Sequence, residues 1–210
     1  MLYKIETDGP YEGYEMIDNH IKSLKNVEGF SCEIGLRRGG GSLQIMNSFI
    51  NNQDPRIHIA IDPYGAIPYK NIFGTSIPDY TNEMRNQTLS LIYQEVVKNK
   101  NTFIFFNIED SEFFVRFESG VPIYQDSKKI IYNKYAFVHI DGQHDLESVR
   151  MSAEFFNHRT SIGGLLAFDN VYDYDHNVIH NYLLDNGFEF LSESSSKKVY
   201  RKNEDSLHSQ

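Results

Sequence analysis

The chain has 210 residues, 40% of them hydrophobic, which is enough to bury one sizeable core and too few for two independent ones. Its formal net charge of −9 disfavours a nucleic-acid partner, because Lys and Arg supply most of the affinity for phosphate. One cysteine excludes an intramolecular disulfide and no apolar run is long enough for a signal sequence or a membrane span, so we expect a cytoplasmic protein with no membrane partner.

The predicted elements begin with an amphipathic helix at residues 11–27, where apolar side chains recur at helical spacing. Apolar, β-prone runs then predict five strands, at residues 29–34, 56–61, 102–108, 135–140 and 164–168. Helix-like stretches lie between them, at residues 42–51, 82–98, 111–117 and 145–156. After the fifth strand we expect a helix at 174–186 and two strands at 187–192 and 197–201, joined by a polar turn.

This alternation of strands and helices is typical of parallel βαβ units. The predicted fold class is α/β, with a mostly parallel seven-stranded sheet that ends in an antiparallel hairpin and carries helices on both faces. We divide the chain into an N-terminal helical segment at 1–28, one domain at 29–202 and a polar tail at 203–210.

The segment from Phe30 to Ser42 is a predicted strand that runs into glycines and then a helix. Glycines let the backbone approach a ligand, and a helix N-terminus offers free N–H groups. The dinucleotide pattern G-x-G-x-x-G is not met after Gly35. Instead, Glu33-x-Gly35-x-x-x-Gly39 resembles the first motif of class I S-adenosylmethionine-dependent methyltransferases, which have a Rossmann-like fold. The resemblance implies that Glu33, Gly35, Gly39 and Ser42 bind this cofactor, and a plain glycine-rich turn is the alternative.

The next two strand ends also carry acids. Asp62 ends the second strand and is placed to accept both hydroxyls of a ribose, unless it only caps the turn before Pro63. Asp110 and Ser111 follow the third strand, at a position that lies near the adenine ring in the resembled family. Either residue also suits the N-cap of the next helix.

Four polar residues follow the fourth and fifth strands: Asp141, His144, Asp169 and Asn170. The carboxyl ends of parallel strands lie at one edge of the sheet, so these side chains should converge. Carboxylate and amide oxygens suit Mg²⁺ or another divalent cation. The structural alternatives are a turn at Asp141 and a plain loop exit at Asp169 and Asn170.

The run from Phe137 to Asn170, with its I-D-G-x-H and G-G-x-x-x-x-D patterns, resembles small-molecule O-methyltransferases, in particular the macrocin-type sugar enzymes and the catechol-type enzymes. The two resemblances together cover roughly residues 29–171. They imply methylation of a hydroxylated small molecule, such as a sugar, a glycan or a secondary metabolite. They also imply that Asp141, Asp169 and Asn170 bind the metal, that Asp141 also contacts the cofactor, and that His144 is the base.

Several further expectations remain open. Arg37 and Arg38 either meet the cofactor carboxylate or are solvated, and His58 and His139 should be core histidines because they lie within apolar strands. Residues 63–80 are the expected lid or acceptor wall, and a homodimer is the default oligomeric state. The competing functions are a catalytically inactive methyltransferase-like binding module and a Rossmann oxidoreductase.

Overall fold

The computed structural model describes residues 13–71, 74–76 and 80–203. The strands are β1 (Phe30–Ile34), β2 (His58–Ile61), β3 (Tyr69–Asn71), β4 (Gly74–Ser76), β5 (Phe103–Phe106), β6 (Val121–Gln125), β7 (Lys128–Tyr132), β8 (Tyr135–Ile140), β9 (Thr160–Phe168), β10 (Phe188–Glu193) and β11 (Lys198–Lys202). The helices are α1 (Tyr14–Ile21), α2 (Gly40–Asn51), α3 (Asn82–Asn99), α4 (Asp110–Arg116), α5 (Leu146–Asn157) and α6 (His176–Asp185), and a 3-10 turn at Lys22–Leu24 continues α1. Residues 11–12 of the predicted first helix and nearly all of the predicted polar tail lie outside the described residues.

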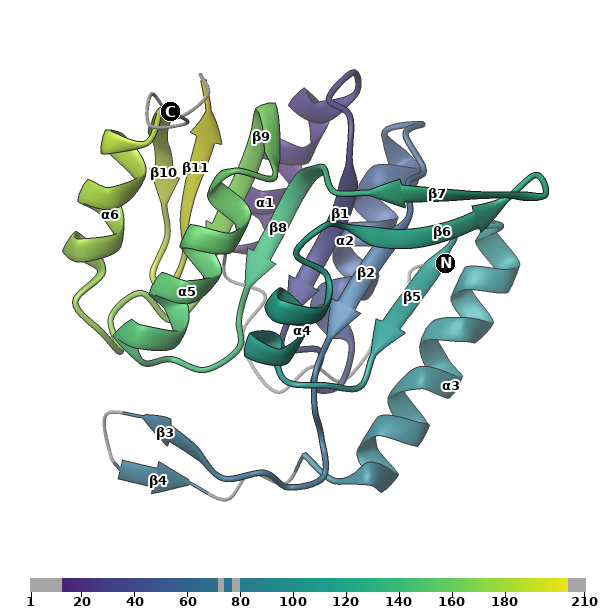
Figure 1. The fold of residues 1–210 in the computed structure, drawn as a ribbon, viewed down its shortest axis with the longest axis horizontal. Helices are drawn as coiled ribbons and strands as arrows, with labels where there is room; N and C mark the ends of the chain where they lie inside the picture. Colours follow the sequence, from purple (N-terminus) through teal and green to yellow (C-terminus); the bar gives the residue numbers. More distant parts are fainter. Residues whose placement is uncertain (1–12, 72–73, 77–79, 204–210) are drawn as a thin grey trace.

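Seven strands form the main sheet in the order β5-β2-β1-β8-β9-β11-β10 (Figure 1). The first five of these are parallel, whereas β11 pairs antiparallel with both β9 and β10. Strands β1, β2 and β8 are buried along their whole length, as expected of strands that helices cover on both faces. The predicted fold class is therefore confirmed.

Apolar side chains of alternate strand residues point to opposite faces of the sheet and form separate cores. On one face, Phe137 of β8 packs with Ile17 of α1 and Phe49 of α2, and α3 extends this layer. On the other face, Val138 belongs to the core that includes Phe113 of α4 and residues of α5 and α6. The result is a three-layer arrangement in which α1 to α3 cover one face and α4 to α6 the other (Figure 1).

Two hairpins were not expected from the sequence. Strands β6 and β7 form an antiparallel ribbon that projects past the edge of the sheet, and their turn residues Asp126 and Ser127 both have positive φ, 52° and 61° (Figure 1). Strands β3 and β4 pair within the segment 63–80 and lie beyond the carboxyl ends of the parallel strands (Figure 1). That is where a lid or acceptor wall was expected, and this role stays a prediction.

Among the described residues, none of the helices is both long and apolar enough to cross a bilayer.

Candidate active site

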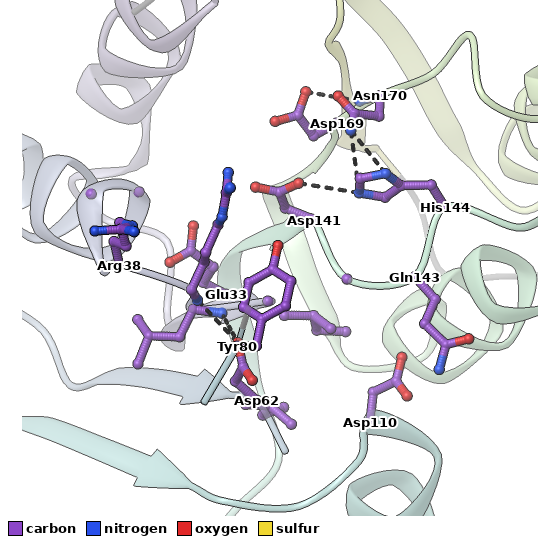
Figure 2. A pocket seen from close by; sticks show the side chains of 18 of the residues that line it. Glu33, Arg38, Asp62, Tyr80, Asp110, Asp141, Gln143, His144, Asp169 and Asn170 are labelled. Atoms are coloured by element: carbon purple, nitrogen blue, oxygen red, sulfur yellow. Dashed lines mark hydrogen bonds and ion pairs between the residues drawn. The ribbon is translucent and has the colours of Figure 1, made fainter. Parts of the chain in front are cut away.

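A cavity of about 490 Å³ lies at the carboxyl ends of β1, β2, β8 and β9 (Figure 2). This volume is in the usual range for sites that bind small molecules. We call the part formed by residues 33–38, 40 and 41, with Asp62 and Asp110, the loop side. We call the part formed by Asp141, His144, Asp169, Asn170 and Lys197 the histidine side.

The glycine-rich loop brings the ends of β1 and β8 into close contact. Gly35 has φ of +88°, and a Cβ at this position would lie 2.0 Å from the carbonyl oxygen of Asp141. The Asp141 N–H donates to the carbonyl of Ile34 at 3.0 Å, so the contact is part of the strand pairing. Gly41 plays a similar part, because its Cβ would lie 2.0 Å from Oε1 of Glu33. Any side chain at Gly35 or Gly41 would therefore displace the floor of the cavity.

Asp62 ties the loop to the end of β2. Its Oδ2 accepts hydrogen bonds from the backbone N–H groups of Leu36 and Arg37, at 2.9 and 3.0 Å, and its Oδ1 accepts from the Tyr64 N–H at 2.9 Å. Burial raises the pKa of this carboxyl, although the three N–H groups oppose the rise. A carboxylate has about four lone-pair positions, so one remains for a ligand donor. The contact of Asp62 with the ribose hydroxyls stays a prediction.

A buried chain of polar groups lies beneath the loop side. The Ser42 hydroxyl donates to Oε2 of Glu33 at 2.5 Å, and Oε1 of Glu33 lies 2.9 Å from Nδ1 of His139. Nε2 of His58 lies 2.8 Å from Oγ of Ser42, and its Nδ1 lies 2.9 Å from Oγ of Ser31. Burial raises the pKa of Glu33, and the contacts with His139 and Ser42 oppose this rise. Both histidines are fully buried, as expected of core histidines.

Three residues predicted to bind the cofactor do not line the cavity. Ser42 is fully buried beneath it as the partner of Glu33. Gly39 is the N-cap of α2 and faces the side chain of Ile92 in α3. The Ser111 N–H donates to Oδ1 of Asp110 at 2.8 Å. Asp110 itself does line the cavity, and neither it nor Ser111 is the N-cap of α4, since that position is Glu109.

The histidine side brings the four polar residues of the fourth and fifth strand ends together, as predicted. Nε2 of His144 lies 3.5 Å from Oδ1 of Asp141, and its Nδ1 lies 2.8 Å from Nδ2 of Asn170 and 3.4 Å from Oδ2 of Asp173 (Figure 2). Burial lowers the pKa of His144, but the carboxylates of Asp141, Asp173 and Asp169 outweigh burial and raise it. His144 is therefore a basic imidazole that is held at both ring nitrogens.

Asp169 already has a cation beside it. Its Oδ2 forms an ion pair with the ammonium of Lys197, whose side chain is 3% exposed. Burial raises the pKa of Asp169, but the charges of His139 and Lys197 outweigh this and hold the pKa below its usual range. Since Lys197 stands at Asp169 and the Asn170 amide faces His144, the residues predicted as metal ligands do not fit a divalent ion as they are arranged.

The described residues contain one group with metal-like spacing, and it is a different one. Ligand atoms of Glu33, His139 and Asp141 lie within 4.8 Å of one another. Both oxygens of Glu33 are hydrogen-bonded, however, to Ser42 and His139. The group shares only Asp141 with the predicted site, so the metal assignment stays a prediction.

The structure adds residues to the cavity wall that the sequence did not single out. They are Tyr14, Gln44 and Lys197, whereas Tyr64 and Tyr80 of the wall come from the segment 63–80 that was expected to form the acceptor wall. Arg37 and Arg38, left open above, both line the cavity, and the Arg37 guanidinium lies 5.5 Å from the ring centre of Tyr80. Tyr14 belongs to the predicted first helix, but nothing in that helix pattern distinguishes a cavity residue from a core residue.

No family model matches the chain. One curated protein, the 3-isopropylmalate dehydratase small subunit of Buchnera aphidicola, is 32% identical over 116 residues. That match covers 49% of this chain and 52% of the curated protein, so the chain spans about half of its relative's length.

Solved structures resemble the chain over almost its whole length. The O-methyltransferase NovP matches 91% of the chain and 79% of its own, with a TM-score of 0.62 and 15% identity. An O-methyltransferase from Bacillus cereus in complex with SAH matches 95% and 84%, with a TM-score of 0.62 and 10% identity. CalS11, a TDP-rhamnose 3'-O-methyltransferase of calicheamicin biosynthesis, matches 91% and 79%, with a TM-score of 0.56 and 14% identity. The chain therefore has the fold of class I S-adenosylmethionine-dependent methyltransferases.

Proposed function

We propose that the protein is an S-adenosylmethionine-dependent methyltransferase that methylates a hydroxyl of a small molecule, such as a sugar, a glycan or a secondary metabolite. The observation that carries this proposal is the position of Asp62, a buried acid at the end of β2 that both lines the cavity and holds the backbone of the Gly35 loop. An acid at this place in a Rossmann-like sheet is suited to a ribose. The SAH complex of a protein with the same fold adds support.

The loop side suits this cofactor in charge as well as in shape. When bound, S-adenosylmethionine supplies a methyl group on a positively charged sulfur. Glu33, Asp62, Asp110 and Asp141 line the cavity and give it a negative potential that attracts such a ligand. Arg37 and Arg38 line the same side and offer a partner for the carboxylate of its amino-acid part.

The histidine side provides the base. When His144 carries its proton on Nδ1 and donates it to Oδ2 of Asp173, 3.4 Å away, the lone pair of Nε2 is available to take a proton. Bound S-adenosylmethionine would supply the methyl group for the acceptor oxygen and would leave as S-adenosylhomocysteine. The hydroxyl proton passes to Nε2 of His144. Asp141, 3.5 Å away, stabilises the imidazolium that results.

The sequence also predicted that a divalent metal assists the reaction, with Asp141, Asp169 and Asn170 as its ligands. In this structure it would require the Lys197 ammonium to leave Asp169. The proposed proton transfer to His144 needs no such rearrangement, so the methyl transfer and the metal are separate proposals.

Isothermal titration calorimetry of the full chain with S-adenosylmethionine, S-adenosylhomocysteine and NAD tests the function. We expect the first two ligands to bind and NAD not to bind. Absence of S-adenosylhomocysteine binding would contradict the proposal, and NAD binding would favour the oxidoreductase. Transfer of a radiolabelled methyl group to a panel of sugar nucleotides and phenols then separates an enzyme from an inactive binding module.

A further inference from the structure

Lys197 is a buried lysine inside the cavity rather than a surface residue. Only 2% of the residue is exposed, although it comes from the turn between β10 and β11. Its ammonium pairs with Oδ2 of Asp169 and lies 4.7 Å from the ring centre of Tyr14. Buried lysines are uncommon unless they are paired, so this position has a specific structural cause.

The surrounding backbone fixes this lysine in place. The Lys197 N–H donates to Oγ of Ser194 at 3.2 Å, and the Lys197 carbonyl accepts from the Ser194 N–H at 2.8 Å. The Val171 N–H donates to the carbonyl of Ser196 at 3.1 Å, which joins the turn to the loop that follows β9. The stem of the lysine passes Gly13, where a Cβ would lie 2.9 Å from the Lys197 Cδ. The turn thus places the Lys197 ammonium at the end of β9.

A divalent cation and this ammonium compete for the same carboxylate. Asp169 is one of the three predicted metal ligands, and it lies with the other two, Asp141 and Asn170, on the cavity wall. A cation bound to Asp169 would sit against a buried positive charge that has little water to screen it. An ammonium also has three N–H donors, and its contacts among the described residues are one carboxylate and one ring face.

We infer that Lys197 is the built-in cation of this site: it occupies the place of a divalent metal beside Asp169 and presents its remaining donor capacity to the acceptor oxygen. The claim that Lys197 takes the place of a metal, which we call the cation part, is based on its ion pair with Asp169 and on its burial. The claim that Lys197 contacts the acceptor oxygen rests on the proposed function. In this inference Lys197 contacts the acceptor oxygen directly, and methyl transfer to a hydroxyl proceeds here without a divalent metal.

Binding of Mn²⁺ alone, followed by electron paramagnetic resonance, tests the cation part without any substrate. We expect wild-type protein to bind no Mn²⁺ at about 1 mM, the weak end of protein sites for divalent cations. We expect Lys197→Met to gain one bound Mn²⁺ and the double variant Lys197→Met/Asp169→Asn to lose it again. Lys198→Met is the matched control, because Lys198 lies in the same hairpin and pairs instead with Glu193, at 3.6 Å; it should gain nothing.

Two results would overturn the inference. One is Mn²⁺ binding by the wild-type protein that the Asp169→Asn substitution abolishes. This comparison does not depend on a folded Lys197 variant. The other is a Lys197→Met protein with a native circular dichroism spectrum that gains no Mn²⁺. Calorimetry with S-adenosylhomocysteine on the same wild-type sample reports separately on the proposed function, so the two failures are distinguishable.

Discussion

On the loop side of the cavity, Asp62 is bonded to three backbone N–H groups, whereas on the histidine side His144 is contacted by the side chains of Asp141, Asn170 and Asp173. Backbone geometry follows from a local sequence pattern, because glycines and a strand end fix it. Contacts between side chains depend on which distant residues the fold brings together. The loop side is therefore expected to bind, and the histidine side to react, as separable functions.

The largest expected effect is on turnover. His144→Ala removes the base and should lower turnover by about 10²–10⁴-fold, the usual contribution of a general base, while affinity for S-adenosylhomocysteine stays nearly unchanged. Steady-state kinetics with the acceptor and calorimetry measure the two quantities. His158→Ala is the control, since His158 is exposed and does not line the cavity. Near wild-type turnover in a folded His144→Ala protein would remove His144 from the chemistry.

The second effect is on cofactor affinity. Asp62→Ala removes one ribose contact and the partner of two loop N–H groups, so we expect a loss of about 1.5–3 kcal/mol, or roughly 10- to 150-fold in Kd. Calorimetry with S-adenosylhomocysteine measures it, with the exposed Asp185→Ala as control. If Asp62→Ala lowered turnover but left this affinity unchanged, the loop side would not be the part of the cavity that binds the cofactor.

The third effect is on stability and concerns the polar chain beneath the loop. Burial, reinforced by the nearby His139, lowers the pKa of His58 to about 3. The unfolded chain therefore takes up a proton near pH 6.5 that folded His58 does not, so stability falls as pH drops from 6.5 towards 3. Chemical denaturation measures the free energy of unfolding across this pH range, and this free energy should depend less on pH in His58→Gln than in wild type. The same dependence on pH in both proteins would mean that His58 is not buried as a neutral group.

The smallest expected effect is that of metal removal. Because Lys197 already neutralises Asp169, turnover should be unchanged after EDTA treatment and should not rise on adding Mg²⁺. A loss of turnover that Mg²⁺ restores would show that the histidine side works through a metal.

The sequence was sufficient for the main sheet and for the place of the cavity. Strands such as 135–140 are continuous apolar runs, and parallel strand ends must share one edge of the sheet. It was not sufficient for the β6–β7 hairpin. That ribbon is largely exposed, its apolar residues stand beside Pro, Gln and Lys, and its turn signal is only the pair Asp126 and Ser127.

Individual contacts of the site were harder to predict. The resemblance of the loop to the methyltransferase motif implied that Ser42 contacts the cofactor, but the close approach at Gly41 places Glu33 under α2 and makes Ser42 its partner. Lys197 is 28 residues from Asp169 and was expected only at the start of a strand after a polar turn. No local pattern connects two residues whose contact depends on where β11 enters the sheet.

The placement of β11 has a consequence for synthesis of the chain. Among the described strands, β11 is made after both β9 and β10, yet it inserts between them and buries Val199 and Tyr200 (Figure 1). Before it arrives, β9 presents an unpaired edge, which is a surface prone to pairing with other chains. A nascent chain with the loop side already formed would therefore lack Lys197, and Asp169 would have no cation beside it until the turn before β11 has emerged from the ribosome.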